Sequence, residues 1–291
     1  MFVNRSSNLT CFSRERPSLT CYDAVRVPEY NPPSGAKPLD LRSPLLKVKR
    51  AKQHISDLNA KRAAFIGSNT YTGAPKFNPE TSRTQFVLRD VPAIDPEIRL
   101  VLGDVAHNLR TALDHLACEL ARSVEVADPR VYFPIFKNEE VYKAESPRKT
   151  KGLPKEAKDF IDRIGPYGGH DDLLWGLHEL DRIDKHHLLL AITAKSSRVA
   201  SPVISSALDM NLPIYIHYSA FSSALKTGDV IGEIEGNYEA DKEMGVAADI
   251  AFGEPEVFRG EALFPKLDLL AERVEVVINL FVPNPRSGML T

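Results

Sequence analysis

The sequence has few cysteines and no long apolar run, and these two absences exclude several classes of protein. Its three cysteines, Cys11, Cys21 and Cys118, cannot all pair with one another, and none lies in a Cys-x-x-Cys motif. A disulfide framework or a thiolate metal site is therefore not expected. No stretch approaches the roughly 20 apolar residues that cross a bilayer, and residues 1–10 lack the apolar segment of a signal peptide. We expect a cytoplasmic protein without a membrane partner.

Several motifs of common enzyme classes are also absent. Neither GxGxxG nor GxxxxGK[ST] occurs, so no nucleotide-binding glycine loop is predicted. The serines near residue 201 lack the strand-turn-helix context of a hydrolase nucleophile. Hydrophobic residues make up 43% of the chain and charged residues 26%, which is typical of a globular protein. Function must therefore be sought in the arrangement of polar side chains.

The order of the predicted elements indicates an α+β fold. Residues 1–40 are rich in Ser, Pro and Asn and are expected to form a flexible N-terminal arm. Residues 41–291 are predicted to form a single domain. It consists of a helical part at about 43–187, a β meander at about 188–255 and a C-terminal helix at about 260–281.

Apolar spacing and turn residues place the individual elements. Apolar residues recur at helical spacing in five segments, which form the predicted bundle: 43–66, 96–122, 154–164, 171–187 and 260–281. Alternating or short apolar runs predict six strands: 85–93, 188–194, 198–205, 213–219, 229–235 and 246–252. Residues 67–79 are expected to break the first helix, and 131–136 to be a short strand or extended loop. Residues 143–155 form a basic stretch.

The second predicted helix carries polar side chains in its middle, beside a long apolar stripe. At about 100° per residue, two polar rows flank the stripe. One row contains His107, Arg110 and Asp114, and the other contains Asp104, Asn108, Thr111 and His115. Solvated helix faces are usually filled with Lys and Glu. Two imidazoles, an amide and a guanidinium therefore indicate a functional site, whereas Arg110 and Asp114 alone would also fit a surface ion pair.

The fourth predicted helix holds a second group of titratable residues, His178 to His187. Helical projection places Asp184 within the apolar stripe and Asp181 at its edge. A buried carboxylate requires a partner, and we expect Asp184 to contact Arg110, His107 or His115 of the second helix. Asp184 could instead cap the entry to the following strand.

Arg110 and His115 also have the arginine, four residues, histidine spacing by which the chain resembles the HEPN superfamily of helical ribonucleases. The resemblance implies metal-independent RNA cleavage, with His115 as the acid-base group and Arg110 as the phosphate ligand. Asn108, Asp114 and Asp184 would support them. Because Arg110 and His115 point about 140° apart on a straight helix, they could share one phosphate only across a homodimer or on a bent helix.

Two alternatives remain open at this stage. The first is a divalent-metal protein or metal-dependent hydrolase, because facing helices of a bundle commonly hold such sites. Its candidate ligands are His107, Asp114, His178, Asp181 and His186. The second is a non-enzymatic interaction protein in which the same groups form a structural ion network. The leading hypothesis, an RNA-directed HEPN-like protein, requires no cofactor.

Overall fold

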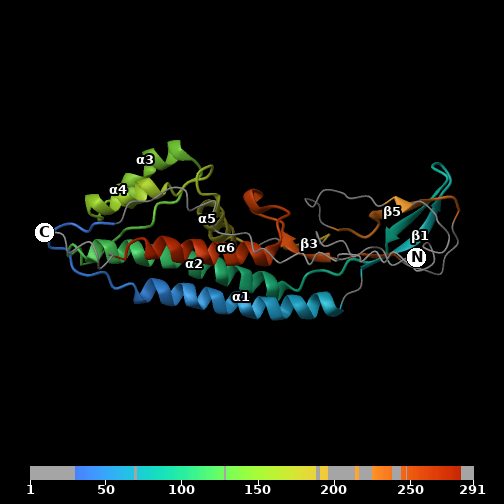
Figure 1. Cartoon of the computed structure of the whole chain (residues 1–291), viewed down its shortest axis with the longest axis horizontal. Coiled ribbons are helices and arrows are strands. Elements are labelled where there is room, and N and C mark those ends of the chain that lie inside the picture. Colours follow the sequence, from blue (N-terminus) through green and yellow to red (C-terminus); the bar gives the residue numbers. More distant parts are fainter. Residues whose placement is uncertain are drawn as a thin grey trace, which may run out of the picture.

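The computed structural model has an α+β architecture, with long helices in one part and a β-sheet at the far end (Figure 1). It describes residues 30–68, 71–127, 129–187, 191–195, 214–215, 225–237, 244–246 and 248–282. The helices are α1 (Arg42–Ser68), α2 (Pro96–Arg122), α3 (Glu139–Lys149), α4 (Lys155–Ile164), α5 (Asp172–Asp184) and α6 (Leu263–Asn279), with a short 3-10 turn at Glu256–Phe258. Among the described residues, no helix has both the length and the apolar character needed to span a membrane.

Three long helices form the centre of the helical part. α1 packs along α2, and both contact α6, while α5 packs against α2 and α6 (Figure 1). Their inward faces share one apolar core, which extends to α4 and to the extended segment around Phe133. Burial of this continuous apolar surface is the main force that holds the bundle together.

Helix α2 confirms the sequence prediction in detail. It begins at Pro96, and the side chain of Asp95 accepts a hydrogen bond from the backbone N–H of Glu97 at 2.9 Å. The cap satisfies a backbone donor that the first helical turn leaves open. Every residue of the predicted stripe except Val101 is buried: Ile98, Leu102, Val105, Leu109, Ala112, Leu113, Leu116 and Leu120. The polar rows therefore flank a fully packed face.

The strands form two antiparallel groups. A five-stranded sheet has the order β4-β5-β2-β1-β6, and β3 pairs separately with β7. Their bounds are β1 (Tyr71–Asn78), β2 (Arg83–Leu88), β3 (Ala191–Lys195), β4 (Ile214–Tyr215), β5 (Val230–Glu235), β6 (Met244–Val246) and β7 (Ala248–Phe252). The larger sheet has its own apolar cluster, with Phe86 and Ile231 at its centre. Arg62 of α1 forms an ion pair with Asp249 of β7, which joins the helical part to the smaller sheet.

The larger sheet is not built from the predicted meander at 188–255 alone, and the strand predicted at 85–93 belongs to it as β2. Strands β1 and β2 precede α2 in the chain, yet they occupy the middle of the larger sheet. β1 falls in the segment predicted as a break, because Gly73 and Pro75 within it are typical of turns. Gly73 is required by packing: a Cβ there would lie 2.6 Å from Cδ1 of Ile231.

Two further predictions need correction. The basic stretch 143–155 overlaps helix α3, which has only two buried residues, Tyr142 and Ser146, and so lacks a clear apolar period. The predicted flexible arm is wrong for residues 30–40. Tyr30 is buried, and its ring lies 5.5 Å from that of Phe160 and 5.0 Å from that of Phe281, centroid to centroid. The rest of the predicted arm and the predicted strand 198–205 lie outside the described residues.

Candidate functional site

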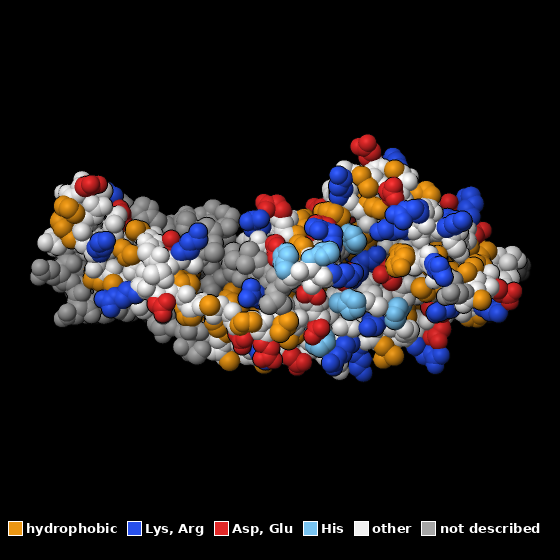
Figure 2. All heavy atoms as spheres, turned by 180° about the vertical axis from the view of Figure 1, so that it is seen from behind, with side chains coloured by type: hydrophobic (Ala, Val, Ile, Leu, Met, Phe, Trp, Pro, Cys, Tyr) orange, Lys and Arg blue, Asp and Glu red, His pale blue; other side chains and the backbone are white. Residues whose placement is uncertain are grey.

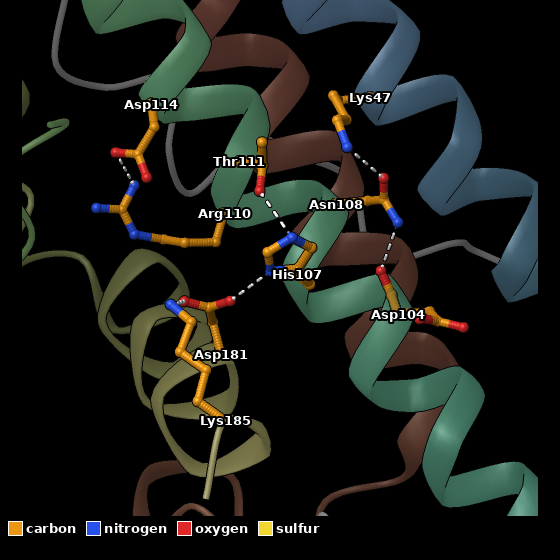
Figure 3. Close-up of polar contacts among 9 residues, drawn as sticks. All are labelled: Lys47, Asp104, His107, Asn108, Arg110, Thr111, Asp114, Asp181 and Lys185. Atoms are coloured by element: carbon orange, nitrogen blue, oxygen red, sulfur yellow. Dashed lines mark hydrogen bonds and ion pairs between the residues drawn. The ribbon is translucent and has the colours of Figure 1, made fainter.

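Helices α2 and α5 face one another through three pairs of residues. From here on, the polar row means these three pairs, and no longer the rows predicted on α2 alone. Gly103 lies against Asp184, His107 bonds Asp181, and Arg110 lies close enough to His178 to affect its charge. Along α2 the three positions rise in number, while along α5 they fall, so the helices run antiparallel at this contact (Figure 3). Spacings of three and four residues keep each set on one side of its helix.

His107 and Asp181 form the centre of the polar row. Nδ1 of His107 lies 3.1 Å from Oδ1 of Asp181, and the other oxygen of Asp181 accepts a hydrogen bond from Nζ of Lys185 at 2.6 Å (Figure 3). The Asp181 side chain is only 5% exposed, whereas that of His107 is 56% exposed. Since a carboxylate only accepts hydrogen bonds, it favours the tautomer with the proton on Nδ1. Nε2 of His107 then carries the lone pair.

The Nε2 atom has a hydroxyl neighbour. Oγ1 of Thr111, one helical turn along α2, lies 3.4 Å from Nε2 of His107 (Figure 3). A hydroxyl, an imidazole and a carboxylate in this order are the elements of proton-transfer sites in which the carboxylate orients the base. The arrangement can accept a proton at Nε2 while Asp181 stabilises the imidazolium that forms.

Arg110 has a different environment from His107. Its side chain is 6% exposed, and it donates to Oδ1 of Asp114 at 2.8 Å and to the carbonyl oxygen of Phe133 at 2.8 Å. Oδ1 of Asp114 also accepts from the backbone N–H of Phe133 at 2.9 Å. Arg110 and Asp114 together therefore hold both backbone groups of Phe133. Because Phe133 pairs with no strand among the described residues, the two side chains replace the hydrogen bonds a sheet would supply.

His178 extends the polar row toward α3. Burial lowers its pKa to about 4, and the positive charges of Arg110 and Lys149 act in the same direction. Burial also lowers the pKa of Lys149, again with a contribution from Arg110. His178 is therefore a neutral imidazole in a region of positive charge at neutral pH.

Asp184 lies at the opposite end of the row, against Gly103. Burial and the charges of Asp104 and Asp181 raise its pKa, while His107 and Lys185 oppose the shift. The predicted direct contact of Asp184 with an imidazole or with Arg110 is wrong, because Asp181 is the carboxylate that bonds His107. Helical projection placed Asp184 inward, but Asp181 is the buried one.

Two residues of the second predicted row of α2, Asn108 and His115, face α1. Nδ1 of His115 lies 2.7 Å from Oγ of Ser43, and the amide oxygen of Asn108 accepts from Nζ of Lys47 at 3.3 Å. Burial, followed by the charge of Lys47, lowers the pKa of His115. Arg110 and His115 therefore contact different elements, and the chain does not bring this predicted pair together within one molecule.

The predicted metal ligands are also not gathered. In the described part of the chain, no group of three or more His, Cys, Asp or Glu side chains could hold a metal ion. His107, His178 and Asp181 do lie along the polar row, but His186 follows the end of α5 and is exposed. The helix predicted to reach residue 187 ends at Asp184 because Lys185 closes it in a turn.

Two groups of the site, Thr111 and Lys185, have no role in the sequence predictions, and Lys149 falls in the basic stretch 143–155, which the sequence favours as a solvated surface although it could gather phosphates. Lys185 stands four residues after Asp181 and Thr111 four residues after His107, so helical spacing contains the signal for both. Lys149 could not be found in this way, because α3 reaches the site from a distant part of the chain. Comparison with protein-family models, with curated proteins and with solved structures finds no match to this chain.

Proposed function

We propose that the polar row is an acid-base site that cleaves RNA, with His107 as the group that accepts and returns the proton. The observation that carries the proposal is the pairing of an exposed His107 with the buried Asp181 carboxylate at 3.1 Å. Nε2 of His107 would take the proton of a ribose 2′-hydroxyl and later return it to the leaving oxygen. Proton transfer by a positioned side chain of this kind contributes typically 10²- to 10⁴-fold to a rate.

This assignment keeps the reaction class suggested by the HEPN resemblance but moves the acid-base role from His115 to His107. Two features support the change. His107 is the more exposed of the two imidazoles, and it alone is bonded to a carboxylate of α5. Arg110 would not bind the substrate itself, since its guanidinium is committed to Asp114 and Phe133. One molecule contains all of these groups, so this site requires no second subunit.

The test is incubation of the purified protein with mixed RNA in EDTA, with product formation followed over time. We expect cleavage by the wild type and a loss of roughly 10²-fold or more in His107→Gln. His54→Gln, a histidine of α1 outside the row, is the matched control and should cleave like the wild type. His115→Gln separates the two assignments: a loss equal to that of His107→Gln would overturn ours. Absence of cleavage by the wild type would reject the proposed function.

A second candidate is a non-enzymatic role in which the row stabilises the bundle. The engagement of Arg110 favours it, because a guanidinium that is 6% exposed and bonds two partners acts as a structural clamp. The two candidates assign different roles to His107. A structural His107 would affect unfolding when replaced, whereas a catalytic one would affect turnover while the protein stays folded.

A further inference from the structure

Histidine side chains gather with Lys and Arg side chains on one face of the helical part, seen from behind in Figure 2. Three basic groups from separate segments of the helical part lie near enough to act on one another by charge: Arg110 of α2, Lys149 at the end of α3 and His178 of α5. Arg110 is offset by its ion pair with Asp114, and His178 is neutral at neutral pH, so Lys149 carries the charge of this cluster that has no ion-pair partner among the described residues. A buried or half-buried charge of this kind is favoured by a partner of negative charge.

Lys149 is placed to meet such a partner. Its Nζ lies 4.4 Å from the centroid of the Phe136 ring, and the side chain is only partly exposed. Within the described part of the chain it forms no ion pair, unlike Lys143 of the same helix, which pairs with Glu139 at 2.7 Å. An ammonium held over an aromatic ring keeps its donors available.

His178 provides a second group. Its Nδ1 is buried and has no hydrogen-bond partner among the described residues, and its ring lies 5.8 Å from that of Trp175. Buried polar atoms nearly always have a partner, so a group of this kind marks a place where a ligand can supply one. The carboxylates that face the cluster are Asp114, Glu145, Glu179 and Asp181. All four are already committed to other cations: Asp114 to Arg110, Asp181 to Lys185, Glu145 to Arg148 and Glu179 to Arg182.

We infer that Lys149 and His178 form a binding site for the phosphate group of the substrate, above the fixed charge of Arg110. Lys149 would donate a hydrogen bond directly to a phosphate oxygen. The neutral His178 ring would donate either by turning an N–H toward the phosphate or by gaining a proton, which the negative charge of the phosphate favours. Arg110 would act through its charge, since its hydrogen bonds are already made. Along α5, His178 stands three residues from Asp181, so this site adjoins His107.

This inference rests on the proposed function for the identity of the substrate, but binding and cleavage are measured separately. The experiment titrates the full chain, at constant ionic strength, with inorganic phosphate and with a dinucleoside monophosphate. Ring signals of His178 are followed by NMR. Both probes should shift these signals saturably, and Lys149→Gln should weaken binding roughly tenfold or more. Lys143→Gln, the matched control on α3, should bind like the wild type.

Each outcome decides between the two proposals. No saturable shift with either probe, or equal binding by Lys149→Gln and the wild type, overturns the phosphate site. Saturable binding of both probes by a protein that cleaves no RNA supports the phosphate site and rejects the proposed activity. Binding of inorganic phosphate alone supports an anion site but overturns a phosphodiester as its ligand. If Lys149→Gln unfolds, Lys149→Met serves instead: it keeps the packing on the Phe136 ring but removes the charge, and should weaken phosphate binding in the same way.

Discussion

Nδ1 of His107 lies 3.1 Å from Oδ1 of Asp181, so a buried carboxylate on α5 holds an exposed imidazole on α2. The same carboxylate is bonded by Lys185, which offsets its charge in the interior. A buried charge with two hydrogen-bonded partners is stable where an isolated one would not be. This relationship defines the orientation of His107 and therefore the chemistry proposed for the site.

Asp181→Asn should weaken both stability and activity. The amide keeps the shape of the side chain but removes the charge that Lys185 and His107 meet, so we expect a loss of about 1–3 kcal/mol in the free energy of unfolding. Urea denaturation measures it. RNA cleavage by the folded Asp181→Asn variant should be lower than that of the wild type, as is expected for His107→Gln. Glu179→Gln, which removes an ion pair with an Arg182 side chain that is 54% exposed, is the control and should change stability by less than about 1 kcal/mol.

Gly103→Ala should disturb the end of the polar row. A Cβ at this position would lie 2.1 Å from Oδ1 of Asp184, so the carboxylate or the helix must move. Overpacking of this kind costs about 1–3 kcal/mol. Thermal or urea unfolding of Gly103→Ala, Asp184→Ala and the double variant gives a double-mutant cycle. The double variant should be more stable than the sum of the single effects predicts; strict additivity would contradict the close approach.

Arg110→Met should release the segment around Phe133. Loss of the guanidinium leaves Asp114 and the Phe133 carbonyl without their shared donor. We expect the free energy of unfolding to fall by about 2–4 kcal/mol. This is less than the loss of about 3–5 kcal/mol typical of a fully buried pair, because the Asp114 side chain is 26% exposed. Hydrogen exchange at the Phe133 amide should become faster. Arg148→Met, which removes an exposed side chain of α3, should leave that amide protected.

His178 should make stability depend on pH. Its pKa is lowered from 6.5 to about 4 in the folded protein, so between these values the unfolded chain binds more protons than the folded one. Stability should therefore fall as the pH falls through this window, by at most about 3 kcal/mol from this residue. The measurement compares urea unfolding of the wild type and of His178→Gln from pH 7 to pH 4. Parallel curves for the two proteins would show that His178 does not cause the loss.

Helix α2 could be predicted from the sequence because its determinants are local. The Asp95 cap, the proline at the first position and the apolar stripe all lie within the helix or next to it. The same holds for α4, which Gly165 ends in a left-handed conformation, as the Gly165-Pro166 pair indicated. Local chemistry of this kind does not depend on the rest of the fold.

The partners across the polar row could not be predicted in the same way. Asp181 and Asp184 differ by only about 60° in helical projection, so the register of α5 against α2 decides which carboxylate reaches His107. The burial of Arg110 depends on the carbonyl of Phe133, 23 residues further along the chain. Strand β1 forms because it pairs with β2 and β6. Its own glycine and proline are typical of turns, so its local sequence does not predict a strand.

The most direct test of the account is the tautomer of His107, measured by nitrogen NMR of the imidazole ring at a pH where it is neutral. If Asp181 holds the ring as described, the proton resides on Nδ1 in the wild type, and this preference is lost or much reduced in Asp181→Ala. If the wild type instead shows the proton mainly on Nε2, with the same signals in Asp181→Ala, then the carboxylate does not orient His107 and the acid-base site proposed for the polar row is wrong.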